Sequence, residues 1–227
     1  MKKTILIITL FISSLSYSQY CAFFDFKTDE PEMVVSSLKG MMQTDWAKNI
    51  QGTKSLFAYQ FNGTNGATHS VQFCFPDEAA FASFSSSWNS SLVAQVFGEK
   101  LNKYIKPVNQ ALNTPVWFQN DWTPDQVFFI YQMDVSDPSA YVKEFAEFSM
   151  SWAQKTGMTS SYGVGFPISG KNAEFSHFVW TGAPDIETAL STTKKMFNDP
   201  LFAKYSSKVS KIRKLVNTTM MVRLMDF

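Results

Sequence analysis

The hydrophobic and polar positions of this 227-residue chain follow strand and helix periods in an order that occurs twice. Short runs rich in aromatic and β-branched residues predict a first strand in each half, at 20–26 and 127–133. Apolar residues at helical spacing follow, behind Pro31 and Pro138, which suit the first position of a helix. Turns rich in Asn and Gly then indicate a hairpin in each half. The hairpin strands are expected at 55–61 and 69–75, and at 160–166 and 175–181.

A second helical region and a last strand complete each half. These helical regions open at Asp77 and Asp185, acidic residues that suit the positive end of a helix dipole, and the pattern extends them toward residues 106 and 214. The last strands are expected at 115–118 and 219–225. The order strand–helix–strand–strand–helix–strand predicts a ferredoxin-like unit, in which two helices cover one face of an antiparallel sheet.

The two halves also share residues at a nearly constant spacing. His69-Ser70-Val71 recurs as His177-Phe178-Val179, and Pro76-Asp77 recurs as Pro184-Asp185, each 108 positions later. Because several matches occur in the same order, we expect an internal repeat. The predicted units are 19–118 and 126–227, joined by a polar linker at 119–125.

Each unit leaves one face of its sheet uncovered, and two copies in one chain can bury those faces together. We therefore expect an α+β fold in which two tandem ferredoxin-like βαββαβ units pack their antiparallel sheets face to face as a pseudo-dimeric α/β barrel. With this unit order and the segment Asn198-Asp199-Pro200-Leu201-Phe202-Ala203-Lys204-Tyr205, the chain resembles the dimeric α/β barrel superfamily. That superfamily includes the antibiotic-biosynthesis monooxygenase-like and stress-response barrel families.

The first 18 residues have the three-part pattern of a secretory signal peptide. Lys2 and Lys3 precede an apolar run at 4–15, and Ser16-Tyr17-Ser18 places small residues before a cut at Gln19. A buried N-terminal helix or strand is the alternative. The pattern predicts a periplasmic or secreted protein, and no other stretch is apolar enough for a membrane span.

Composition and charge narrow the function. The chain is 45% hydrophobic and contains 22 Phe, which argues against a disordered protein. Its net charge of +1 falls to about −1 without Lys2 and Lys3, so we expect no nucleic-acid partner. A stripe of basic residues at helical spacing, Lys204, Lys208 and Lys211 with Arg213 and Lys214, is interpreted as a solvated face.

The resemblance leaves several functions open. The favoured one is an exported protein that binds a small apolar or aromatic molecule without catalysis. One alternative is a cofactor-independent monooxygenase-like enzyme acting on an aromatic substrate. A haem-binding barrel is another, since chlorite dismutase-like haem proteins are also tandem ferredoxin-like units, with His177 as the axial candidate. No other cofactor is expected, and a structural role or self-association into a homo-oligomer stays open.

The candidate site residues belong to two groups. His69 and His177 are the chain's two histidines, and they suit proton transfer in a pocket, or else are polar residues at strand ends with local partners. Tyr59, Tyr162, Trp117 and Arg223 are expected to line one mostly apolar cavity, with plain core as the alternative.

Cysteine usage adds a structural expectation and little chemistry. Cys21 and Cys74 fall on the first and third predicted strands, which are neighbours in a ferredoxin-like sheet, so they form either a disulfide or two buried thiols. No His-x-His or Cys-x-x-Cys pattern is present, so no metal site is predicted.

Overall fold

The computed structural model describes residues 19–170 and 174–227, so the predicted signal peptide at 1–18 lies outside the described residues. The first half (unit 1) contains β1 (Tyr20–Lys27), α1 (Pro31–Met42), α2 (Asp45–Lys48), β2 (Thr53–Phe61), β3 (His69–Phe75), α3 (Glu78–Ser90), α4 (Leu92–Leu101) and β4 (Lys106–Gln119). The second half (unit 2) contains β5 (Val127–Val135), α5 (Pro138–Thr156), β6 (Tyr162–Ser169), β7 (His177–Ala183), α6 (Ile186–Phe197), α7 (Pro200–Val209) and β8 (Arg213–Asp226).

The strands of the described residues close into one barrel, in the order β1-β3-β2-β8-β5-β7-β6-β4. Unit 1 contributes the antiparallel sheet β4-β1-β3-β2, and unit 2 contributes β8-β5-β7-β6. The two sheets join edge to edge, where β2 pairs with β8 and β4 pairs with β6. The predicted class, an α+β fold of two tandem ferredoxin-like units forming a pseudo-dimeric barrel, is confirmed.

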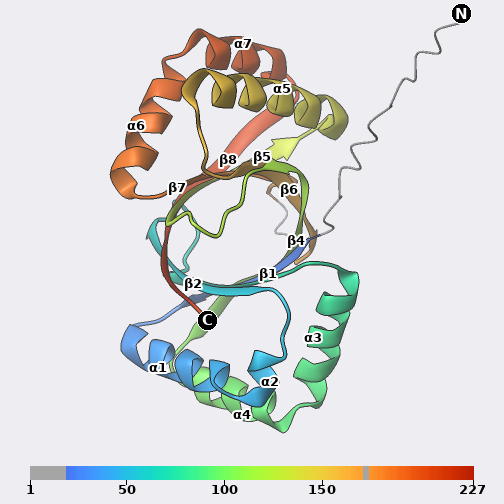
Figure 1. Cartoon of the computed structure of the whole chain (residues 1–227), viewed down its shortest axis with the longest axis vertical. Coiled ribbons are helices and arrows are strands. Elements are labelled where there is room, and N and C mark those ends of the chain that lie inside the picture. Colours follow the sequence, from blue (N-terminus) through green and yellow to red (C-terminus); the bar gives the residue numbers. More distant parts are fainter. Residues whose placement is uncertain (1–18, 171–173) are drawn as a thin grey trace, which may run out of the picture.

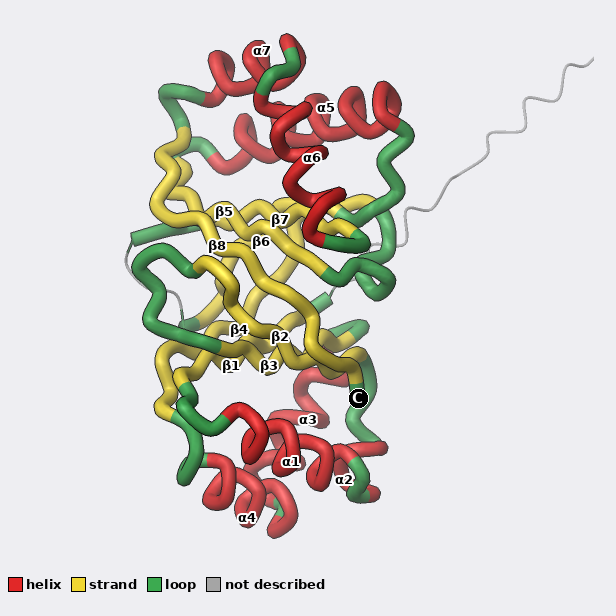
Figure 2. Tube along the Cα trace, turned by 90° about the vertical axis from the view of Figure 1, so that its left-hand side faces the viewer, coloured by secondary structure: helices red, strands yellow, loops and turns green. Residues whose placement is uncertain are grey.

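The helices cover the outside of the barrel in two separate groups. Figure 1 shows the barrel end-on, with α1–α4 on one side and α5–α7 on the other. The side view in Figure 2 shows the two sheets as adjacent layers between these groups. The molecule therefore has three interior regions: a helix–sheet interface in each unit, and the space enclosed by the strands, which we call the lumen.

Local sequence signals account for the helix starts. Pro31 and Pro138 stand at the beginning of α1 and α5, as expected. The Asp77 carboxylate accepts a hydrogen bond from the Ala80 N–H at 2.8 Å, and Asp185 accepts one from the Thr188 N–H at 2.7 Å. Both aspartates thus cap the first turn of a helix. Within the described ranges, none of the helices is both long and apolar enough to cross a bilayer.

The last strand of each unit is longer than predicted. β4 and β8 each have 14 residues and begin at Lys106 and Arg213, where the helical pattern was expected to end, well before the expected strand starts at 115 and 219. In unit 1 the helix cannot continue through Pro107, because proline lacks the N–H and clashes with the preceding turn. A strand of this length spans about 46 Å. It can therefore pair within its own unit and also reach the other one.

A disulfide joins two neighbouring strands of unit 1. Cys21 on β1 lies directly opposite Cys74 on β3 in the antiparallel register, and their sulfur atoms are bonded. Both residues line the lumen. The bond closes a loop with a sequence separation of 53 residues, and it therefore restricts a large part of unit 1 in the unfolded chain.

We expect the double substitution Cys21→Ala and Cys74→Ala to lower the free energy of unfolding by about 2–4 kcal/mol, because the unfolded chain regains the freedom of that loop. Urea denaturation of the oxidised protein and of the double variant measures the difference. Reduced wild-type protein should resemble the variant. Equal midpoints for oxidised and reduced protein would contradict the expectation.

Candidate functional site

In the described part of the chain, one cavity lies between the sheet and the helices of unit 2. Its volume is about 360 Å³, within the range of pockets that hold small molecules. Its walls come from strands β5, β6, β7 and β8 on one side and from helices α5, α6 and α7 on the other. Most of the lining is apolar and includes the rings of Phe145, Phe148 and Phe202. We call this space the unit-2 cavity.

The equivalent space in unit 1 is filled by aromatic rings. Phe84 of α3 lies with its ring centroid 5.1 Å from Phe73 and 5.1 Å from Phe75, both on β3. Phe81 and Trp88 of α3 pack against the same cluster, at 5.5 Å from Phe75 and 5.6 Å from Phe84 respectively. Sheet and helices of unit 1 therefore meet through a solid aromatic core.

Strand register shows why unit 2 is hollow. Phe26 pairs with His69 in unit 1, and Met133 pairs with His177 in unit 2, so β3 and β7 correspond at a spacing of 108 residues. The capping residues of α3 and α6, Asp77 and Asp185, have the same spacing. At this spacing, four aromatic residues of unit 1 correspond to non-aromatic residues that line the unit-2 cavity: Phe73 to Thr181, Phe81 to Ala189, Phe84 to Thr192 and Trp88 to Met196.

Three polar side chains stand out in this apolar lining: Tyr141 of α5, Tyr205 of α7 and Arg213 of β8. The Arg213 Cζ atom lies 5.2 Å from the centroid of the Tyr205 ring, within cation–π range. The Tyr141 hydroxyl donates to Met133 Sδ at 2.8 Å. Burial raises the pKa of both Tyr141 and Tyr205, so both hydroxyls are protonated at neutral pH.

The placement of Arg213 corrects one expectation. Arg213 was grouped with Lys204, Lys208 and Lys211 on a solvated helical face, but α7 ends at Val209 and Arg213 is the first residue of β8. The basic residues keep helical spacing beyond Val209, although the helix itself ends there. The side chain of Arg213 instead lines the unit-2 cavity.

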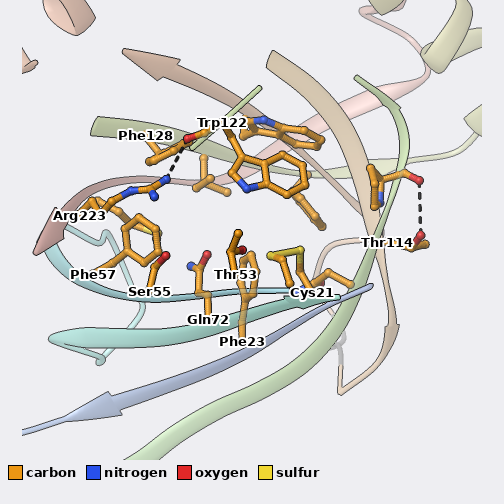
Figure 3. A pocket seen from close by; sticks show the side chains of 17 residues that line it. Cys21, Phe23, Thr53, Ser55, Phe57, Gln72, Thr114, Trp122, Phe128 and Arg223 are labelled. Atoms are coloured by element: carbon orange, nitrogen blue, oxygen red, sulfur yellow. Dashed lines mark hydrogen bonds between the residues drawn. A yellow bond between two sulfur atoms is a disulfide. The ribbon is translucent and has the colours of Figure 1, made fainter. Parts of the chain in front are cut away.

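The second cavity lies in the lumen and is smaller, about 80 Å³. Figure 3 shows Arg223 at one side of it, with its guanidinium near the backbone of Trp122 and with the Cys21 disulfide across the space. Arg223 is 8% exposed, donates to the Trp122 carbonyl at 2.9 Å and pairs with Asp226 at 2.9 Å. Its guanidinium therefore fastens the inter-unit connection to the end of β8.

Large rings occupy much of the remaining lumen. Trp180 and Phe178 lie against Gly163 and Gly165 of β6, where a Cβ atom would approach those rings to 2.4 Å and 2.8 Å. These two glycines permit the close approach, so the Gly-Val-Gly stretch is a packing feature. The volume left over suits a few water molecules rather than a ligand of drug size.

The four residues expected to line one cavity lie in different places, and that expectation is wrong. Arg223 lines the lumen cavity, and Tyr59 also faces the lumen, where its hydroxyl donates to Asp25 Oδ1 at 3.0 Å. Tyr162 lines the unit-2 cavity, and Trp117 packs behind it with a ring separation of 5.8 Å.

The error came from the alignment of β2 with β6. Leu56 pairs with Val71, and Val164 pairs with Val179, so Leu56 corresponds to Val164. Tyr59 lies three residues after Leu56, whereas Tyr162 lies two residues before Val164, so the two tyrosines differ in register by an odd number of residues. In a strand such a slip turns a side chain to the opposite face of the sheet.

The two histidines occupy matching positions, and neither lines either cavity. Nδ1 of His69 lies 2.9 Å from the Thr68 hydroxyl, and Nδ1 of His177 lies 3.0 Å from the Ser176 hydroxyl. The rings lie beside Phe26 and Phe166, at centroid distances of 5.8 Å and 6.1 Å. Burial lowers the pKa of His69 below its usual value.

The sequence reasoning missed the residues that define the unit-2 cavity, although a signal for them was present. Reading the two halves against each other at a spacing of 108 pairs Phe73 with Thr181 and Phe84 with Thr192. A loss of aromatic residues from only one copy of a duplicated core indicates where a cavity opens.

Solved structures with the same architecture exist. A candidate monooxygenase from Fusobacterium nucleatum covers 92% of this chain and 93% of its own, with TM-score 0.59 and 16% identity. An anthrone oxidase-like protein covers 95% of both chains, with TM-score 0.61 and 11% identity. This chain has the dimeric α/β-barrel fold. At these identities the likeness extends to the fold alone. No family model and no curated protein matches the sequence.

A haem-binding protein from Thermus thermophilus shares this dimeric α/β-barrel fold, with TM-score 0.55, 12% identity and 92% coverage of both chains. The described residues that line the unit-2 cavity include no histidine, and His177 packs outside the lining. His177 shares its sheet face with Met133 and Val179, which line the cavity, but the lining of the described residues holds no imidazole ligand for a haem. Among the described residues, no cluster of three or more His, Cys, Asp or Glu is arranged to hold a metal ion.

We expect the stability of the protein to fall as pH is lowered through about 6.5, partly through His69. Because its pKa is lower in the folded chain than the ordinary value of 6.5, the unfolded chain takes up this proton first. The loss ends once the pH is below the folded-state pKa. Denaturation midpoints between pH 7.5 and 5.5 should decline less steeply for His69→Gln. Parallel curves for the variant and the wild type would refute this role.

Proposed function

We propose that this protein is an exported binding protein, which holds a small apolar or aromatic molecule in the unit-2 cavity without catalysis. The observation that carries the proposal is the difference between the two halves. Where unit 1 places Phe73 and Phe84, unit 2 places Thr181 and Thr192 beside a cavity of about 360 Å³. Leaving a core unfilled lowers stability, so a cavity of this size is explained by an occupant.

The chemistry of the lining favours binding over catalysis. The described residues that line the cavity include no Asp, Glu, His or Cys. The hydroxyls of Tyr131, Tyr141 and Tyr205 keep their protons, because burial raises their pKa. The lining therefore supplies hydrogen-bond donors and a cation, but no group that accepts a proton at neutral pH.

A monooxygenase-like activity is the second candidate. It is supported by the fold shared with proteins described as a candidate monooxygenase and as anthrone oxidase-like. Oxygen uptake by purified protein in the presence of an electron-rich aromatic phenol separates the two functions. Binding without oxygen uptake supports the first candidate, and turnover that is lost in Thr181→Phe supports the second.

Export is proposed from the N-terminal pattern, and the disulfide supports it. Disulfides persist outside the reducing cytoplasm, and Cys21 and Cys74 are bonded. We expect protein recovered from the host envelope or medium to begin at Gln19 and to contain the oxidised pair. Intact-mass measurement with and without a reductant checks both points. A full-length, thiol-containing protein in the cytoplasmic fraction would contradict export.

Filling the unit-2 cavity should abolish binding without unfolding the protein. We expect Thr181→Phe with Ala189→Phe to weaken binding of a neutral fluorescent probe, N-phenyl-1-naphthylamine, at least about tenfold, since the new rings take the ligand's space. The melting temperature should stay equal or rise, because unit 1 accommodates rings at both corresponding positions, Phe73 and Phe81.

The matched control is Ser191→Phe, which adds a ring on the exposed side of the same helix, α6. This variant should bind the probe like the wild type. If the cavity-filling variant folds and binds with unchanged affinity, the probe occupies another place and the proposed site is wrong.

A further inference from the structure

The polar residues of the unit-2 cavity are found at positions that are apolar in unit 1. α1 and α5 both begin with proline, so Tyr141 corresponds to Val34. Lys27 pairs with Lys106, and Asp134 pairs with Lys214, so Arg213 corresponds to Ile105. Tyr205 corresponds to Phe97, the buried aromatic residue of the last helix in unit 1. Each of these unit-1 residues packs in the core of its unit.

These three side chains offer more donors than their surroundings accept. A guanidinium carries five N–H groups. The acceptors around Arg213 are the thioether of Met133 at 3.8 Å, the hydroxyl of Ser206 at 3.4 Å and the hydroxyl of Tyr141. Thioether sulfur is a weak acceptor, and Tyr141 donates to the same atom.

The charge of Arg213 is also unbalanced within the part of the chain that the structure describes. No carboxylate of the described residues lies within 4.0 Å of its guanidinium. Glu144 of α5, which acts on Tyr205 electrostatically, is paired with Lys208. Arg213 is half-buried, so the part of its guanidinium that faces the apolar cavity lacks both full hydration and a protein counter-ion, and a ligand anion would supply that charge.

A carboxylate on the ligand would supply both the missing hydrogen-bond acceptors and the missing negative charge. The planar guanidinium matches a carboxylate through two parallel N–H···O bonds, and such charge-assisted bonds are among the strongest in proteins. The hydroxyls of Tyr141 and Tyr205 line the same cavity, are hydrogen-bonded to each other and stay protonated. To donate to a carboxylate, Tyr141 would turn its O–H away from Met133 Sδ, which is a weak acceptor. The rings of Phe145, Phe148 and Phe202 suit the apolar remainder of such a molecule.

We propose that the ligand of the unit-2 cavity is an apolar or aromatic carboxylic acid, whose carboxylate is bound by Arg213 together with the hydroxyls of Tyr141 and Tyr205. This inference rests on the proposed function, because it names the chemical class of the molecule in the same cavity. It makes Arg213 the residue that distinguishes an acid from its neutral analogue.

The test compares two probes of nearly equal shape, 2-naphthoate and 2-naphthamide, by isothermal titration calorimetry at pH 7.5. We expect the acid to bind at least about tenfold more tightly than the amide, as is typical of a hydrogen bond to a charged group. Arg213→Gln should remove this preference, and Arg213→Lys should keep part of it. Tyr205→Phe should lower the binding affinity for the acid more than the affinity for the amide.

The control is Lys214→Gln, which removes the same charge from the exposed neighbouring residue. Lys214→Gln should keep the full preference for the acid over the amide. A loss of that preference in this variant would indicate that long-range charge, and not contact with Arg213, causes it. Binding of N-phenyl-1-naphthylamine and a cooperative melt verify that each variant is folded. If acid and amide bind wild type equally, the carboxylate inference fails and the proposed function stands. If 2-naphthoate, 2-naphthamide and the naphthylamine all fail to bind, the carboxylate inference and the proposed function both fail.

Discussion

Pairing of strands between the two units is the constraint on which the structure depends. A single unit would leave the outer edges of its sheet open, and open edges invite association with other chains. Here β2 pairs with β8 and β4 pairs with β6, so each unit closes the other. The lumen is consequently shared, and its side chains must suit both sheets. Each helix–sheet interface belongs to one unit and is free to differ.

The two interfaces have indeed diverged. Unit 1 contains the aromatic cluster around Phe84 and also the Cys21–Cys74 bond, both of which stabilise the folded chain. Unit 2 has smaller residues at the corresponding positions and a cavity beside them. Removing core volume costs stability through lost contacts and empty space. The division suggests that one half supplies much of the stability and the other supplies the space for a ligand.

The sequence predicted what depends on repetition and period, namely the two units, the order of the elements and the fold class. It failed where a result depended on register or on the end of an element. Tyr59 and Tyr162 were expected to line one cavity, but the strand pairing places them on opposite faces of the sheet. Arg213 was assigned to a helix because basic spacing continued past Val209. The cavity could not be foreseen from one half alone, since it is a difference between two packed interiors.

The order of strands along the chain affects how the protein can be made. β8 is the last strand of the barrel in chain order, yet it lies between β2 of the first unit and β5 of the second. Arg223 near its end then ties the connection at Trp122 to the same closing strand. The barrel cannot close before β8 has been synthesised. Until β8 is available the sheet edges stay unpaired, and closure through contacts so distant in sequence is typically slow.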